Sequence, residues 1–311
     1  MTCKKVRRKF DVLALGAVSV DDLLYVDSYP APDEKAEVLR RERQCGGISG
    51  IALIAAARLG ASCGYAGVLG RDELSRFAAG QLRAEGIDLK HLARRGGVGP
   101  IHSVILIDIN RATRNIFFDI STVLGASIDW PPAEVIQSTR VLFADWFSVP
   151  GMIRATRLAR QAGIPVVADF EQQNHRKFST LLNLPDHLIL SKSFAAKVTG
   201  LSDPRRALRK LWKKHHQLAA ITCGVAGCWY LSAENPARLR HQPAFAIKAV
   251  DTTGCGDVFH GAYAAALAQG RPAAERIRMA SAAAALKATQ PGGQKGIPTA
   301  AELAAFIKQS Q

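Results

Sequence analysis

Short apolar runs recur along the chain, and segments that we expect to be helical separate them. The runs that predict buried strands are residues 11–18, 63–69, 141–146, 165–170, 187–191 and 218–223. The segments that predict helices between them are residues 51–59, 73–85, 151–162, 193–199 and 203–215. Continuous apolar strands are typical of sheets covered on both faces, and repeated strand–helix units favour parallel pairing. The pattern therefore predicts an α/β fold with a mostly parallel central sheet.

Some segments depart from this alternation. Residues 101–109 and 115–120 alternate as the two strands of a hairpin do, and residues 19–44 also lie outside the strand–helix series. Further along, residues 229–232 and 243–250 predict antiparallel strands at one edge of the sheet. The C-terminal part predicts helices over 257–269, 273–288 and 299–309. No internal repeat or low-complexity linker is present in the sequence, so we expect residues 1–311 to form one domain.

The charge balance is strongly basic. Lys and Arg number 41 and Asp and Glu 26, which gives a formal net charge of +15. Such a chain suits a polyanionic ligand such as ATP, and it also suits non-specific contact with nucleic acid. The sequence has no zinc finger, helix-turn-helix pattern or basic–aromatic stacking platform, so we expect no specific nucleic-acid partner. Residues 49–70 are interrupted by Arg58 and several glycines, so we expect no membrane span.

Cysteine usage indicates a reducing compartment. The cysteines have no Cys-x-x-Cys spacing and are Cys3, Cys45, Cys63, Cys223, Cys228 and Cys255. In a chain of this size such scattered thiols are typical of a cytoplasmic protein, not of a disulfide framework or a metal site. Residues 1–10 are basic but no apolar stretch with a cleavage site follows, so we interpret them as a frayed tail and not as a signal peptide.

The most informative run is residues 250–262, which read VDTTGCGDVFHGA. Gly254 and Gly256 bracket Cys255 at a helix start, where backbone N–H groups can converge into an anion cradle. A carboxylate at Asp257 would repel an anion bound there. It makes sense if Asp257 takes a proton from a hydroxyl while the cradle holds the phosphoryl group under attack. The alternative is a plain strand-to-helix turn with an N-capping Asp.

This Asp-Thr-x-Gly-x-Gly-Asp run resembles the C-terminal motif of the ribokinase-like (PfkB) carbohydrate kinases, and the resemblance extends from about residue 11 to about residue 298. It implies a three-layer ribokinase-like fold in which segments 19–44 and 97–120 form a small β-sheet lid, often also the interface of a homodimer. It further implies transfer of the γ-phosphoryl group of ATP, with Mg²⁺, to a hydroxyl of a small sugar. Asp257 would be the general base, and Gly254, Cys255 and Gly256 would form the phosphoryl cradle.

The acceptor side of the resembled site falls near the N-terminus. Gly46 and Gly47 precede the first long helix, where paired glycines let a substrate approach the backbone. Asp21 and Asp22 project to opposite faces of an extended segment, so only one can bind the sugar. The family spacing selects Asp21, whose carboxylate can accept hydrogen bonds from two sugar hydroxyls. Asp22 is then interpreted as a solvated surface charge.

One subgroup suggests a substrate. Residues 221–298 are similar to those of bacterial sulfofructose kinases, which hold a sulfonate with a lysine, an asparagine and an arginine. Lys35 falls at the lysine position, and the other two positions fall near Phe118 and Phe147. Lys35 is therefore a candidate for an anionic or polar group of the substrate.

The nucleotide side of the resembled site lies in the C-terminal half. Thr222, Gly224 and Gly227 end a buried strand, where a triphosphate could lie against the backbone and where a hairpin turn is equally consistent. In the family the loop that contains Gly293 flanks adenine, and with the turn 251–253 it often binds a monovalent cation. Candidate K⁺ ligands are therefore Asp251 and Thr253. The pair His215 and His216 is interpreted as a solvated helix face.

Two positions depart from the family pattern. Ile51 stands where an asparagine usually contacts the substrate, and Phe194 stands where a glutamate helps to organise Mg²⁺. Mg²⁺ would then be held mainly by phosphates and water, which it tolerates well. Two alternatives to the sugar kinase stay open: a nucleoside kinase on the same fold, and a sugar- or nucleotide-sensing regulator with weakened catalysis.

Overall fold

The central sheet carries most of the chain. The computed structural model describes residues 8–111 and 113–310, so the predicted frayed tail lies largely outside the described residues. Among these, eight strands pair in the order β14 (Arg240–Gln242), β13 (Cys228–Ser232), β12 (Leu218–Thr222), β11 (His187–Ser191), β10 (Val166–Asp169), β9 (Thr139–Ala144), β1 (Phe10–Ala14) and β4 (Cys63–Tyr65). The pairs from β12 to β4 are parallel, and β13 and β14 are antiparallel additions at one edge.

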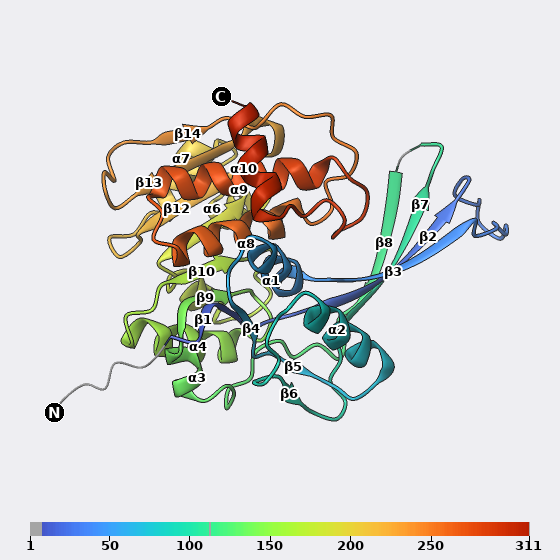
Figure 1. Ribbon diagram of the computed structural model, residues 1–311, viewed down its shortest axis with the longest axis horizontal. Helices are drawn as coiled ribbons and strands as arrows, with labels where there is room; N and C mark the ends of the chain where they lie inside the picture. The colour runs from blue at the N-terminus through green and yellow to red at the C-terminus, as the bar shows by residue number, and fades with distance from the viewer. Residues whose placement is uncertain (1–7, 112, 311) are drawn as a thin grey trace.

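Helices cover both faces of this sheet (Figure 1). One face packs against α1 (Ile48–Arg58), α2 (Glu73–Ala84), α8 (Cys255–Ala268), α9 (Ala273–Ala288) and α10 (Ala300–Gln309). The other face packs against α3 (Ala133–Gln137), α4 (Val149–Gln161), α5 (Phe178–Leu182), α6 (Lys192–Thr199) and α7 (Pro204–Leu211). Alternate residues of each strand enter the two cores: in β9, Val141 and Phe143 face one side and Leu142 and Ala144 face the other. This is the predicted three-layer arrangement.

A second, four-stranded sheet projects from the body (right side of Figure 1). It consists of β3 (Arg40–Gly46), β2 (Ser19–Val26), β7 (Ile101–Asp108) and β8 (Thr113–Asp119), in that order. We call it the lid sheet. β2 and β7 pair in parallel, whereas β3 and β8 pair antiparallel to them. The segments 19–44 and 97–120, which are far apart in the sequence, therefore meet in one small sheet, as predicted.

Helix ends follow local chemistry. The Asp72 side chain accepts a hydrogen bond from the backbone N–H of Ser75 and caps α2, and Thr299 and Glu302 form a reciprocal capping box on α10. Gly200 ends α6 in the left-handed conformation, at a φ of +71°. The core helices α1 and α8 are mostly apolar and have most of their residues buried, because each packs between other elements.

Four predicted elements differ from the structure. The predicted strand 11–18 is shorter, because β1 stops at Ala14. The predicted strand 63–69 is two strands, because the chain leaves the main sheet after Tyr65 and β5 (Val68–Leu69) pairs with β6 (Ala93–Arg94) in a separate small sheet. The predicted strand 243–250 is not a strand. The antiparallel edge is β14 (Arg240–Gln242), and Pro243, which has no N–H to donate, ends the pairing.

The predicted helix over 203–215 also ends early. Helix α7 stops at Leu211, and the next residues form a turn in which the Nδ1 atom of His216 accepts a hydrogen bond from the backbone N–H of Lys213 (3.1 Å). His216 is only 1% exposed. The interpretation of His215 and His216 as a solvated helix face is therefore wrong for His216, because its ring closes the turn and packs edge-on against Trp212.

Phe194 occupies the core and not a cleft. It is 4% exposed and lies edge-on against Phe178, with ring centroids 5.9 Å apart. We expect Phe194→Ala to lower the free energy of unfolding by about 3–5 kcal/mol, because it removes a large buried ring and leaves a cavity. Urea denaturation measures the change. The matched control is Phe117→Ala on the lid sheet, where the ring is 62% exposed, and we expect a change within about 0.5 kcal/mol. Equal effects at both positions would contradict this assignment.

Candidate active site

A glycine turn forms the start of helix α8. Gly254 is the N-cap residue with a φ of +75°, and a Cβ there would lie 3.2 Å from the carbonyl oxygen of Gly293. This conformation and this close approach both favour glycine. At Gly256 nothing lies within 4 Å of the position that a Cβ would take, so the space beside this backbone is open. The predicted convergence of backbone N–H groups at a helix N-terminus is compatible with this geometry.

Two cavities meet at this turn. The first cavity, about 330 Å³, is lined by Thr253 and Asp257 on the turn side. The second cavity, about 280 Å³, is lined by Thr252, Cys255 and Gly256 on the other side. The 252–257 turn therefore separates two chambers, with the carboxylate of Asp257 on the first and the glycine backbone on the second.

The first cavity combines polar ends with apolar walls. Its polar lining is Ser19, Asp21, Ser103, Glu171, Gln172, Thr253 and Asp257, and its larger apolar residues are Ile48, Ile101, Ile105, Ile116, Phe118, Ile120, Trp146 and Phe147. Several of these residues belong to the lid sheet and others to the body. No Lys, Arg or His is among the described residues that line this cavity.

Asp21 reaches the first cavity because Gly46 gives it room. A Cβ at Gly46 would overlap both the Asp21 carboxylate and the Ser19 hydroxyl on the neighbouring strand. The hydroxyl of Ser19 donates a hydrogen bond to Asp21 Oδ1 at 2.9 Å. Burial raises the pKa of Asp21 above its usual value, although the Ser19 and Ser103 hydroxyls oppose that shift. Gly47, also predicted for this site, lines the cavity at a φ of +81°.

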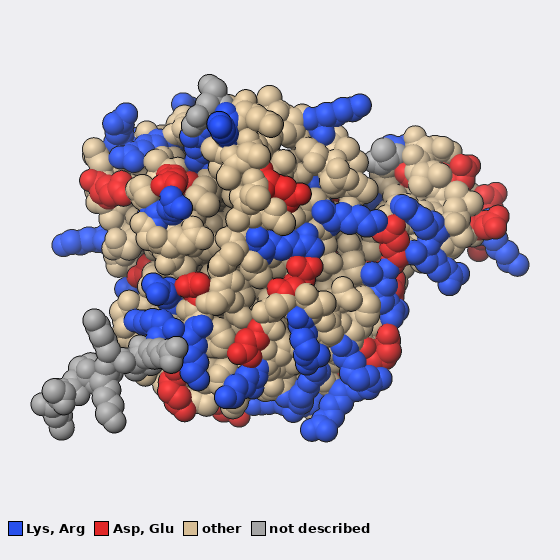
Figure 2. Space-filling view, in the orientation of Figure 1, with Lys and Arg blue, Asp and Glu red and all other residues tan. Residues whose placement is uncertain are grey.

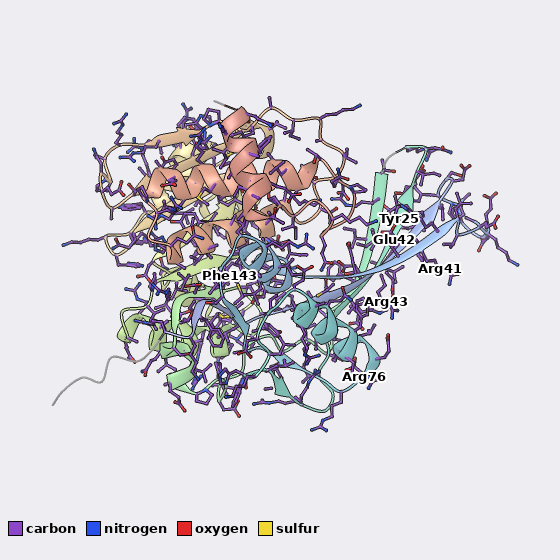
Figure 3. All side chains as sticks on the ribbon, viewed as in Figure 1. Tyr25, Arg41, Glu42, Arg43, Arg76 and Phe143 are labelled. Atoms are coloured by element: carbon purple, nitrogen blue, oxygen red, sulfur yellow. The ribbon has the colours of Figure 1, made fainter. Side chains whose placement is uncertain are left out.

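Asp22 lies on the opposite face of β2, as the alternation predicted, but it is not a free surface charge. Its two oxygens accept hydrogen bonds from Arg43 Nε (2.6 Å) and Nη2 (3.0 Å), and His102 Nε2 lies 2.9 Å away. Figure 3 labels Arg43 on β3 of the lid sheet. The Arg43 guanidinium holds the pKa of Asp22 below its ordinary value. Asp22 therefore joins three strands of the lid sheet, which corrects the solvated interpretation.

The predicted substrate residue Lys35 lies elsewhere. It is exposed in the loop between β2 and β3 and is not among the described residues that line either cavity. By contrast, Phe118 and Phe147, the positions aligned with the other anion-binding residues of the sulfofructose kinases, both line the first cavity. Ile51 is buried beneath the turn, with Cγ2 3.7 Å from the Cβ position of Gly254, so it supports the backbone there.

The second cavity contains most of the predicted nucleotide residues. Thr222 at the end of β12, with Gly224 and Gly227, lines one side. Phe245, Ile247 and Ala249 come from the segment that was predicted as a strand, and small residues of α9 complete the wall. Gly293 does not line it. Its backbone N–H donates a hydrogen bond to Gln44 Oε1 (3.2 Å), so Gly293 joins the C-terminal loop to the lid sheet beside Gly254.

The predicted K⁺ ligands Asp251 and Thr253 form a closed hydrogen-bonded turn. Asp251 Oδ1 accepts from the N–H (2.8 Å) and hydroxyl (2.7 Å) of Thr253 and from Arg114 Nη1 (3.2 Å). Asp251 Oδ2 accepts from the N–H of Gly292 (2.9 Å). Three of these four donors converge on Oδ1, and the backbone carbonyl oxygen of Asp251 accepts from the Lys287 ammonium at 2.8 Å, where a cation would meet a like charge. The donor set at this turn therefore does not fit a monovalent cation.

Asp257 sits in a group of acidic side chains that the sequence analysis did not find. Burial raises the pKa of Asp257 well above the ordinary value of an Asp, and the nearby Asp169, Glu171 and Asp21 raise it further. Asp169 is the last residue of β10 and Glu171 follows it, so both stand at the carboxyl end of a parallel strand. Active sites of α/β sheets commonly lie at this edge, and that is the signal that could have found them.

His260 ties this group together one helical turn after Asp257. Its Nδ1 atom lies 2.8 Å from the carbonyl oxygen of Gly256 and 3.0 Å from Asp169 Oδ2, and its Nε2 atom lies 3.1 Å from the carbonyl oxygen of Ile189. Phe143, labelled in Figure 3, lies edge-on to the ring. His260 thereby fixes the start of α8 to the last residue of β10 and to the middle of β11.

The sequence matches a known protein family along nearly its whole length. A model of the pfkB family of carbohydrate kinases matches residues 9–300. The chain belongs to the pfkB carbohydrate kinase family. Ribokinase of Haemophilus influenzae is 26% identical over 308 residues, which cover 95% of this chain and 98% of the relative. The predicted enzyme class, a carbohydrate kinase, is confirmed by this membership.

Two solved structures superpose closely on this pfkB kinase. A candidate ribokinase from Agrobacterium tumefaciens superposes with a TM-score of 0.88 at 29% identity, covering 96% of this chain and 97% of that one. A candidate ribokinase II from E. coli, in complex with ATP and Mg²⁺, superposes with a TM-score of 0.80 at 20% identity, covering 96% and 99%. The predicted ribokinase-like fold is therefore confirmed.

The structure also bears on the expectations about membrane spans, cysteines and surface charge. None of the described helices is long and apolar enough to span a bilayer. The described cysteines Cys45, Cys63, Cys223, Cys228 and Cys255 are all free thiols. Basic side chains spread over the whole face seen in Figure 2 and do not gather into one patch, although they outnumber acidic ones.

Asp145 fixes the backbone of Phe147, which lines the first cavity. It is fully buried, and it accepts hydrogen bonds from the backbone N–H groups of Ala17 (2.7 Å) and Phe147 (2.9 Å) and from the Ser49 hydroxyl (3.2 Å). Burial nevertheless raises the pKa of Asp145 to about 7. Its protonated form is thus favoured by folding, so its contribution to stability is complete below about pH 4 and is lost as the pH rises through 7.

We expect Asp145→Asn to remove this pH dependence. Between about pH 5 and 8, the free energy of unfolding of the variant should improve relative to the unmodified protein by about 2–3 kcal/mol, because the variant has no carboxyl to ionise. Urea denaturation at both pH values measures the difference. Asp203→Asn is the control, since Asp203 caps α7 at the surface and its pKa is lowered by Arg205. A constant stability gap for Asp145→Asn would contradict the assignment.

Proposed function

We propose that this pfkB kinase transfers the γ-phosphoryl group of ATP to a hydroxyl of a small uncharged sugar, with Asp257 as the general base. The observation that carries the proposal is the position of the 252–257 turn. It presents a carboxylate to the first cavity and glycine backbone to the second. An acceptor in the first cavity and a nucleotide in the second would meet across this turn.

The charges of the first cavity select the acceptor. Asp21, Glu171 and Asp257 line it, and no basic side chain does so among the described residues. A sulfonate, carboxylate or phosphate on the acceptor would meet negative charge without a partner, which is costly in a partly buried site. Neutral hydroxyl groups can instead donate hydrogen bonds to these carboxylates. The apolar walls, with Trp146 and Phe147 stacked 4.0 Å apart between ring centroids, suit the less polar face of a sugar.

The second cavity suits a nucleotide. Its walls of Phe245, Ile247 and small alanines are apolar, and Gly224 and Gly227 border it with backbone. Lys192 is exposed at the start of α6 and directly follows Ser191, which pairs in register with Thr222 of the cavity wall. An ammonium at this mouth would meet the phosphates of a nucleotide. A family relative of this fold was solved with ATP and Mg²⁺.

Mg²⁺ would be held mainly by the nucleotide and by water. The segment after β11 offers the Ser191 hydroxyl, which accepts from the N–H of Phe194 (3.2 Å), and Phe194 itself is buried. Mg²⁺ commonly keeps several waters and binds substrate phosphates, which fits such a site. When bound, the ion neutralises charge on the β- and γ-phosphates.

The chain's own residues would do the remaining work. Asp21 and the backbone at Gly46 and Gly47 orient the acceptor, and Asp257 takes the proton from its hydroxyl. The N–H groups at Gly254 to Gly256 stabilise charge that develops on the transferred group. The raised pKa of Asp257 brings this base nearer to neutral pH, where proton transfer by a general base is most effective. The lid sheet excludes water that would otherwise hydrolyse ATP.

Asp257→Asn tests the base. We expect turnover to fall by at least ~10²-fold, because the amide cannot accept the hydroxyl proton. ATP binding should persist, and thermal stability should be unchanged or higher, because the substitution removes one of several crowded carboxyls. Steady-state kinetics, calorimetric titration with ATP and thermal melting measure the three quantities. Asp22→Asn, on the far face of the lid sheet, is the control and should retain turnover. Near-normal turnover of Asp257→Asn would remove the mechanism.

A panel of acceptors tests the substrate class. We expect ADP release with one or more neutral sugars and a drop in kcat/KM of at least ~10²-fold when a carboxylate, sulfonate or phosphate is added to the same sugar. A preference for an anionic sugar would overturn the uncharged class. A preference for nucleosides would favour the nucleoside kinase. Ligand-dependent thermal stabilisation without ADP release from any acceptor would favour a regulator.

A further inference from the structure

Lys287 is a lysine without solvent contact. It lies in the last turn of α9, and it is 0% exposed. Its ammonium donates a hydrogen bond to the backbone carbonyl oxygen of Asp251 at 2.8 Å. Lysine is almost never fully buried unless it is paired, because a buried ammonium loses its hydration. A buried apolar residue would fill this space at lower cost, so the charge calls for a reason.

The surroundings of Lys287 are those of a cation site. Burial lowers the pKa of Lys287, but the nearby Cys255, Asp251 and Asp257 act in the opposite direction, and Arg114 is the nearby basic group. These acidic neighbours therefore favour the charged form of the ammonium, against the effect of burial. Its position at the C-terminal end of α9 is also favourable for a positive charge.

The ammonium is joined to the phosphoryl cradle by a short path. Backbone N–H groups of Val250 (2.7 Å) and Asp251 (3.1 Å) both donate to the carbonyl oxygen of Ala288, the residue after Lys287. Asp251 in turn accepts from Thr253 and Gly292, and Gly254 follows at once. Lys287 and Asp251 therefore both stabilise the turn. The ammonium bonds the backbone carbonyl of Asp251, and the Asp251 carboxylate bonds the N–H groups of Thr253 and Gly292.

We propose that the Lys287 ammonium is a built-in cation of the phosphoryl cradle and performs the work that a bound monovalent cation would otherwise perform. It fixes the carbonyl of Asp251 and places a positive charge beneath the turn where the transferred phosphoryl group gathers negative charge. This inference rests on the proposed kinase function for its effect on turnover. It requires that the enzyme need no K⁺, in agreement with the donors that already occupy Asp251 Oδ1 and the Asp251 carbonyl.

The experiment removes the ammonium and offers an ion in its place. In the unmodified enzyme, turnover and melting temperature should be the same in KCl and NaCl at an ionic strength of about 0.15 M. In Lys287→Ala, turnover should fall at least ~10-fold in NaCl and recover in part in KCl, because the space left can hold an ion that bonds the Asp251 carbonyl. KCl should also raise the melting temperature of this variant above its value in NaCl.

Matched variants separate charge from packing. Lys287→Met fills the space without a charge, so it should lose turnover and show no response to KCl. Lys287→Arg keeps the charge and should retain most of the turnover. The control is Lys210→Ala, because Lys210 Nζ also donates to a backbone carbonyl, that of Thr199, at 2.8 Å, but far from the cradle in the sequence and on another helix. We expect Lys210→Ala to lower stability at most and to leave turnover unchanged.

Three results would overturn the inference. Activation of the unmodified enzyme by KCl would show that an ion is still required. Normal turnover of Lys287→Met would show that the ammonium is not needed, and a loss in Lys287→Ala with no KCl effect on turnover or melting would assign Lys287 to packing. If the unmodified protein phosphorylates no sugar, the proposed function fails, whereas the KCl-specific melting shift of Lys287→Ala still tests the cation site.

Discussion

The site depends on one constraint: the turn before α8 must be held rigidly in a left-handed conformation between two cavities. Gly254 permits the conformation, and the side chain of Asp251 closes it through the donors of Thr253 and Gly292. His260 fixes the first turn of the helix to β10 and β11. In the proposed mechanism, the base and the anion cradle are useful only if neither moves relative to the other, because catalysis requires positioning before reaction.

The distribution of charge within the protein is opposite to that on its outside. The chain carries a formal net charge of +15, whereas the first cavity is lined by carboxylates and by no basic side chain among the described residues. Burial raises the pKa of Asp257, and the neighbouring carboxylates raise it further. Positive groups are instead placed around the turn, with Arg114 at Asp251 and Lys287 beneath it. The basic exterior can draw an anionic nucleotide to the protein, and the acidic cavity can reject an anionic acceptor.

The lid sheet contacts the body at the turn itself. Arg114 of β8 pairs with Asp251, Gln44 of β3 accepts from Gly293, and Glu42, labelled in Figure 3, pairs with Lys295 at 3.3 Å. These contacts join the element that supplies Asp21 to the loop that supports Gly254. In the proposed mechanism, acceptor binding and the geometry of the cradle would thus be connected through a few exposed and partly buried polar contacts.

Much of this protein was readable from local sequence. The uninterrupted apolar strands required a covered parallel sheet, and helix α9 and strand β11 were predicted with the bounds they have, because periodicity and end signals agree there. The glycines around Asp257 also pointed to the candidate site, since their conformation and spacing are local properties.

Only the tertiary structure decided which distant residues join that site. Asp169, Glu171 and His260 come together because β10 and β11 end, and α8 begins, at one edge of the sheet, and no pairwise spacing along the chain encodes that meeting. The end of a strand at Pro243, the burial of His216 and the paired state of Asp22 likewise follow from neighbours across the fold. Local pattern determines the conformation of a segment, but burial and charge depend on contacts between segments, and these exist only after the chain has folded.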